Sequence, residues 1–132
     1  MTTAIEQQFS IEQFEAGEID AEQFSHAAHA YVAWLYVNQY GETAALPRFD
    51  AALRRLTESL GVPEKYHATI TGFLLTLIAD RIDNRESWPA FCARNTDLLN
   101  DSRTLLANYY SESRLNSVEA RRHFLEPDTP IV

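Results

Sequence analysis

Apolar residues recur at spacings of three and four along almost the whole chain, which is the repeat of an amphipathic α-helix. Strict alternation of apolar and polar residues is missing, and the sequence contains no Asn-Gly or Asp-Gly hairpin signal. The pattern therefore predicts an all-α fold. We expect a compact bundle of about four main helices, followed by short accessory helices toward the C-terminus.

Turn and cap residues divide this pattern into four main segments. The expected ranges are Thr3–Glu15, Asp20–Tyr40, Glu42–Leu60 and Pro63–Asn84. Gly17, Gly41 and Gly61 separate them, because glycine readily adopts the left-handed backbone that ends a helix. Asp20 is the expected N-cap of the second helix, in a capping-box pattern, and Pro63 is the expected first residue of the fourth.

The fourth segment is the most apolar part of the chain, so we expect it at the centre of the core. Beyond it, cap residues predict three short helices that begin after Ser87, Asp101 and Ser117. The whole chain is expected to form one helical domain, residues 1–132. Within that domain, residues 1–19 form an N-terminal arm and residues 126–132 a tail that lies on the surface as a strap.

Composition and charge narrow the classes of function. The 132 residues suit one domain, and 45% hydrophobic with 23% charged residues is ordinary globular usage. A net charge of −8 argues against nucleic acid or an anionic membrane as the partner. Apolar stretches such as Gly72–Ala79 are too short to span a bilayer. The lone Cys92 and the lack of a signal-peptide pattern lead us to expect a soluble, cytoplasmic protein.

Three histidines form the most informative chemical pattern. His26 and His29 are three residues apart on the second predicted helix and therefore share a face. His67 is expected one turn inside the fourth helix, with Thr71 on its face. Imidazoles from two facing helices can converge on one cation, which predicts a metal site of His26, His29 and His67. Histidine-only ligation suits Zn, Cu, Ni or Fe(II), and His123 is a possible fourth ligand if the last helix folds back.

Two classes of function follow from these histidines. In the first, the protein is a metal-binding protein or a metal-dependent enzyme that acts on a small-molecule substrate. Its candidate catalytic residues are Tyr66 as a proton donor, Thr71 to orient a metal-bound water or a substrate, and Arg121 to hold an anionic substrate. In the second, the histidines hydrogen-bond to backbone or carboxylates and only specify the fold. The protein is then a non-catalytic helical binding or regulatory module.

Other chemistry is not indicated by the sequence. No G-x-S-x-G elbow and no glycine-rich phosphate loop occurs, so the common hydrolase and nucleotide-binding fingerprints are missing. Tyr31, Trp34, Tyr36 and Tyr40 follow one another at helical spacing, which is more typical of core packing than of a cofactor site. Cys92 lies in an apolar stripe and is expected to be an inert, buried thiol.

Four stretches resemble a family of small bacterial proteins to which no activity has been assigned. They are FSHAAHAYVAWLYV (24–37), KYHATIT (65–71), SWPAFCARNTDLL (87–99) and NYYSESRLNSVEARRHFLEPD (108–128). The resemblance covers nearly the whole chain from Phe24 onward and implies neither a substrate nor a reaction. It implies that the following residues belong to the motifs of the family: His26, His29, Tyr66, His67, Thr69, Thr71, Tyr109, Tyr110 and Arg121.

Overall fold

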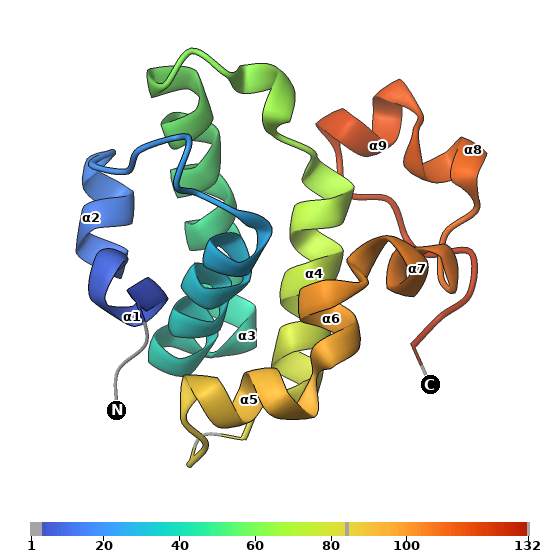
Figure 1. Ribbon diagram of the computed structural model, residues 1–132. Coiled ribbons are helices and arrows are strands. Elements are labelled where there is room, and N and C mark those ends of the chain that lie inside the picture. Colours follow the sequence, from blue (N-terminus) through green and yellow to red (C-terminus); the bar gives the residue numbers. More distant parts are fainter. Residues whose placement is uncertain (1–3, 84, 132) are drawn as a thin grey trace.

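The computed structural model describes residues 4–83 and 85–131, and these residues form helices and connecting turns without a strand (Figure 1). The all-α prediction is therefore confirmed. The elements are α1 (Ala4–Gln8), α2 (Ile11–Ala16), α3 (His26–Ser59), a 3₁₀ turn (Pro63–Lys65), α4 (Ala68–Arg81), α5 (Trp88–Arg94), α6 (Thr96–Asn100), α7 (Ser102–Ala107), α8 (Glu112–Leu115) and α9 (Val118–Arg122).

The segment α3 is a helical hairpin, because the chain reverses direction at Gly41. Gly41 has φ 79° and ψ 163°, far from helical values. The rings of His29 and Phe49 lie 5.3 Å apart, whereas twenty residues of straight helix would separate them by about 30 Å. We call residues 26–40 the first arm and residues 42–59 the second arm; Figure 1 shows them running in opposite directions. The predicted break at Gly41 is confirmed.

The first arm begins later than the sequence pattern predicts. Ser25, not Asp20, is its N-cap, and its hydroxyl accepts the Ala28 N–H at 3.2 Å. The Asp20 carboxylate instead accepts the Glu22 N–H at 3.0 Å, within a turn that precedes the helix. This turn allows the Phe24 ring to pack 5.8 Å from the ring of Phe14 on α2. The helix therefore begins five residues later than the capping-box pattern predicts, and the Phe24 ring packs on α2 just before it.

Helix α4 lies at the centre of the fold, as predicted. The side chains of Phe73, Leu75, Leu77 and Ile78 are at most 1% exposed, and together they cover more than one face of the helix. The helix begins at Ala68 rather than Pro63, because Pro63–Lys65 forms a separate 3₁₀ turn. It ends at Arg81. The expected end at Asn84, like the expected start of the first segment at Thr3, lies outside the described residues.

The short helices pack on both sides of the α3–α4 centre (Figure 1). On one side, Phe14 of α2 stacks on Phe49 with ring centroids 5.4 Å apart, and the Tyr36 hydroxyl donates to Glu15 at 2.8 Å. The predicted N-terminal arm is thus two short helices held against α3. On the other side, the Thr69 hydroxyl of α4 lies 2.7 Å from the carbonyl oxygen of Ala120 on α9.

The C-terminal tail is held to the preceding helices by hydrogen bonds. The Tyr110 hydroxyl donates to the Leu125 carbonyl at 2.6 Å, and the Thr129 N–H donates to the Tyr109 carbonyl at 3.0 Å. Ser87 and Ser117 are N-caps, as predicted. The side chain of Asp101 forms no capping hydrogen bond with the described residues. No helix in the described part of the chain is long and apolar enough to cross a membrane.

Truncating the centre of α4 should destabilise the protein strongly. Leu75 is fully buried, so Leu75→Ala removes packed methyl groups and leaves a cavity. We expect the free energy of unfolding to fall by about 2–5 kcal/mol in urea titrations. Val118→Ala is the control, because Val118 is 66% exposed, and it should change stability by less than about 0.5 kcal/mol. Equal effects of the two substitutions would contradict the placement of α4.

Candidate functional site

The three predicted histidines line one cavity of about 290 Å³, which we call the histidine cavity. His26 and His29 come from the first arm of α3, and His67 comes from the residue before α4. Thr71 of α4 also lines this cavity, whereas Tyr66 does not. The rest of the wall is mostly apolar and comes from the turn before α3, the second arm and the residues on either side of α4's start: Ala21, Phe24, Leu53, Leu56, Leu60, Val62 and Ile70.

His67 is the N-cap of α4, which corrects its expected position one turn inside the helix. Its Nδ1 accepts the Ile70 N–H at 3.2 Å, and its Nε2 donates to the Leu115 carbonyl at 2.9 Å. A carbonyl oxygen only accepts, so Nε2 carries the proton and the ring is neutral with both nitrogens used. Burial lowers the pKa of His67, and the positive charge of Arg121 lowers it further, which also favours this neutral form.

His26 connects the first arm of α3 to α6. Its Nε2 lies 2.9 Å from the carbonyl oxygen of Leu98, and this nitrogen must carry the proton because the carbonyl can only accept. The side chain is half-buried. Like His67, His26 therefore has one nitrogen committed to a main-chain carbonyl that lies far along the sequence.

His29 differs from the other two histidines, because its Nε2 is buried without a hydrogen-bond partner among the described residues. The ring packs against the rings of Phe24 at 5.8 Å and Phe49 at 5.3 Å. Burial, with a smaller contribution from nearby His26, lowers the pKa of His29 to about 4, so the ring is neutral at pH 7. An unpaired buried polar atom costs about 1–3 kcal/mol, so this nitrogen needs an explanation.

The arrangement of these rings bears directly on the metal hypothesis. Within residues 4–83 and 85–131, no group of three or more His, Cys, Asp or Glu side chains is arranged to hold a metal ion. His67 could become a ligand only by giving up its cap bond or its bond to Leu115. A metal site of His26, His29 and His67 therefore stays a prediction.

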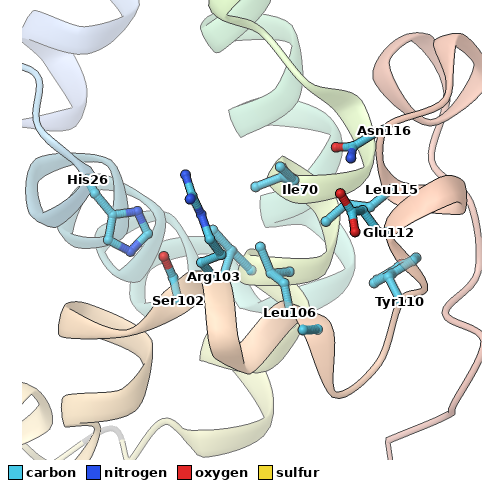
Figure 2. A pocket seen from close by; sticks show the side chains of 11 residues that line it. His26, Ile70, Ser102, Arg103, Leu106, Tyr110, Glu112, Leu115 and Asn116 are labelled. Atoms are coloured by element: carbon cyan, nitrogen blue, oxygen red, sulfur yellow. The ribbon is translucent and has the colours of Figure 1, made fainter.

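A cleft of about 700 Å³ adjoins the histidine cavity, and His26 and Ile70 line both (Figure 2). Figure 2 shows His26 near Ser102 and Arg103 of α7, with Glu112 around α8 at the other end. Aliphatic side chains of α4, α7 and α8, together with Tyr110 and Asn116, complete the lining of the cleft. No motif in the sequence indicates this cleft, because its polar residues come from several short helices.

The other candidate residues lie outside the histidine cavity. Tyr66 and Arg121 are close together, with Arg121 Nη1 3.1 Å from the Tyr66 carbonyl oxygen, and the Tyr66 hydroxyl donates to Asp50. Burial raises the pKa of Tyr66. His123 is exposed beside Arg121, although α9 does pack against α4, so His123 is not brought to the other three histidines. Cys92 is half-buried, and burial raises the pKa of its thiol.

Comparisons with protein-family models, with curated proteins and with solved structures found no match to this chain. The resemblance to a bacterial family therefore stays an expectation. The function has to be argued from the geometry of the histidine cavity and of the cleft beside it.

The buried His29 should make stability depend on pH. The imidazole titrates near 6.5 in the unfolded chain and near 4 in the folded protein, so between these values the unfolded chain binds the extra proton. The free energy of unfolding should therefore fall as the pH is lowered from 6.5 toward 4, with His29 contributing about 3 kcal/mol.

The measurement is a set of urea titrations between about pH 7 and pH 4 on the wild type and on His29→Leu. His67 also has a lowered pKa and contributes in the same direction, but it does so in both proteins and cancels in the comparison. His29→Leu should show the smaller loss of stability at acid pH. If the two proteins lose stability in parallel, His29 is not a buried neutral imidazole.

Proposed function

We propose that the protein is a non-catalytic helical binding module that takes a small, neutral, hydrogen-bonding molecule into the histidine cavity. The observation that carries this proposal is the Nε2 of His29, a buried polar atom without a partner on a ring that forms part of the cavity wall. Buried polar groups in native proteins are nearly always satisfied, and each exception calls for an explanation such as a functional role or a bound partner.

The lining of the cavity supports a small ligand. About 290 Å³ is close to the lower end of the range for small-molecule sites, which are mostly apolar with a few placed polar groups. Here the polar groups are the imidazoles, the hydroxyls of Ser25, Thr57 and Thr71, and the ammonium group of Lys65. Burial keeps His29 neutral, so its unpartnered nitrogen favours a neutral hydrogen-bonding group, and Lys65 is the charged side chain in the same lining.

The adjoining cleft supplies a more polar region for the same ligand. His26 and Ile70 form the wall that the two spaces share. A ligand with an apolar head in the histidine cavity and a polar tail would meet Arg103 and Glu112 on the cleft side. The binding surface would then include the short C-terminal helices as well as α3 and α4.

The candidate catalytic residues support binding rather than catalysis. Tyr66 lies outside the cavity, its hydroxyl donates to Asp50, and burial raises its pKa, all of which oppose proton transfer to a bound molecule. Arg121 also lies outside the cavity. Thr71 remains as a hydroxyl that can orient a ligand, and its hydroxyl has no activating base among the hydrogen bonds of the described residues.

Phenol is a suitable probe, because it has an apolar ring and one hydroxyl. We expect millimolar phenol to shift the backbone amide signals of the first arm around His26 and of α4 around Thr71 in NMR spectra. Benzene, which lacks the hydroxyl, should bind more weakly, and His29→Leu should reduce the difference between the two probes. Phenol shifts that are absent, or confined to other helices, would contradict the proposal.

Metal binding is a second candidate function, favoured by the same unpartnered Nε2 and by the spacing of His26 and His29 on one helix face. The divalent ions Zn²⁺ and Ni²⁺ distinguish the two candidates. For the binding module, neither ion should change the melting temperature at neutral pH. A rise that disappears in His29→Leu would favour the metal site instead.

A further inference from the structure

A third hollow, of about 420 Å³, lies on the surface and is lined by positively charged side chains. It is lined by Arg54 of the second arm, Pro63 and Tyr66 before α4, and Arg121, Arg122 and His123 at the end of α9. We call it the basic hollow. It shares no lining residue with the histidine cavity or with the cleft, so it concerns a different ligand from the one proposed above.

The hollow is positively charged, whereas the whole protein carries a net negative charge. The chain has a net charge of −8 and only eleven Lys and Arg residues, yet three arginines meet here. The carboxylate that neutralises part of this charge is Asp50, whose Oδ2 lies 3.0 Å from Arg54 Nε and whose other oxygen accepts the Tyr66 hydroxyl. Arg121 and Arg122 form no salt bridge within the described residues.

Two of the guanidinium groups are held in place by the fold. Arg54 lies 4.4 Å above the centre of the Tyr66 ring and donates Nη2 to the Arg122 carbonyl at 3.3 Å. Arg121 donates Nη1 to the carbonyls of Glu64 and Tyr66. These contacts use main-chain carbonyls and one ring, and they leave Nε and Nη2 of Arg121 without a bond in the part of the chain described.

Arg122 provides the adjustable part of the hollow. Its side chain is exposed and makes no hydrogen bond or ion pair with the described residues. Three guanidinium groups from two distant segments of the chain, two of them fixed and one free, can surround a single anion. A planar guanidinium matches the oxygen pairs of a phosphate group better than it matches a monatomic ion.

We propose that the basic hollow binds a phosphate-type oxyanion, the phosphoryl group of a small phosphorylated molecule. Arg121 presents its free edge to two phosphate oxygens, Arg122 closes over the anion, and Arg54 adds positive charge from the second arm. The negative charge of the bound anion offsets the repulsion among the three arginines. The bound group also connects α9 to the turn before α4 and to α3.

Calorimetric titration of the full chain with pyrophosphate, and separately with inorganic phosphate, tests this proposal. We expect binding at low salt, weakened about tenfold or more in Arg122→Gln, because a hydrogen bond to a charged group contributes enough for that change. Arg55→Gln is the matched control. Arg55 neighbours Arg54 on α3, is exposed and does not line the hollow, so the same loss of charge there should change affinity by less than about twofold.

Arg121→Lys removes the planar guanidinium group but keeps the positive charge. The melting temperature of the variant shows whether it remains folded. Folded Arg121→Lys should bind pyrophosphate several-fold more weakly than the wild type. Two results would overturn the proposal: no binding of either probe at millimolar concentration, or equal losses in Arg122→Gln and Arg55→Gln. Equal losses would mean that pyrophosphate responds only to the overall charge of the protein.

Discussion

The reversal of the chain at Gly41 is the constraint on which the rest of the structure depends. Its φ of 79° and ψ of 163° fall in a region that is essentially reserved for glycine, and no side chain crowds the position. The reversal places the two arms of α3 side by side, which brings Phe49 against the rings of Tyr36 and His29. Without it, Leu53, Leu56 and Thr57 could not face His26 across the histidine cavity.

The histidines show how a fold can use residues that are also good metal ligands. His67 caps α4 and donates to Leu115, while His26 donates to Leu98, so both rings join segments that are distant in sequence. Each such bond is worth about 0.5–1.5 kcal/mol, whereas structural zinc supplies about 10–16 kcal/mol in small zinc domains. Energy alone would therefore allow a metal to displace these bonds. Within the described residues, however, no group of three or more His, Cys, Asp or Glu side chains is arranged to hold a metal ion.

The sequence predicted the parts of this fold that local chemistry determines. Periodicity predicted the all-α fold and the central α4, and Gly41, Ser87 and Ser117 marked helix boundaries correctly. It failed where tertiary packing overrides a local signal. The helix expected to begin after Asp20 begins only after Ser25, where the Phe24 ring packs on α2, and the 3₁₀ turn Pro63–Lys65 precedes α4, which begins at Ala68.

The candidate site was predicted only in part, because it also depends on tertiary contacts that local sequence does not specify. Helical spacing was enough to place His26 and His29 on one face, and the structure also brings His67 and Thr71 to the same cavity. The bonding state of each imidazole depends on Leu98 and Leu115, whose carbonyls reach the rings from 72 and 48 residues away. No pattern in the sequence specifies such contacts. The same holds for the three arginines of the basic hollow, which come from segments separated along the chain.

The central claim is that the ring nitrogens of His26 and His67 form hydrogen bonds that hold the fold together. The protonation of these rings tests that claim most directly. Long-range ¹H–¹⁵N spectra of the full chain at neutral pH, with and without Zn²⁺, report which ring nitrogen carries the proton. We expect a proton on Nε2 of both His26 and His67, and a neutral ring for His67, with neither changed by zinc. A zinc-dependent loss of the Nε2 proton on His67, or a His67 ring protonated at Nδ1, would contradict the claim.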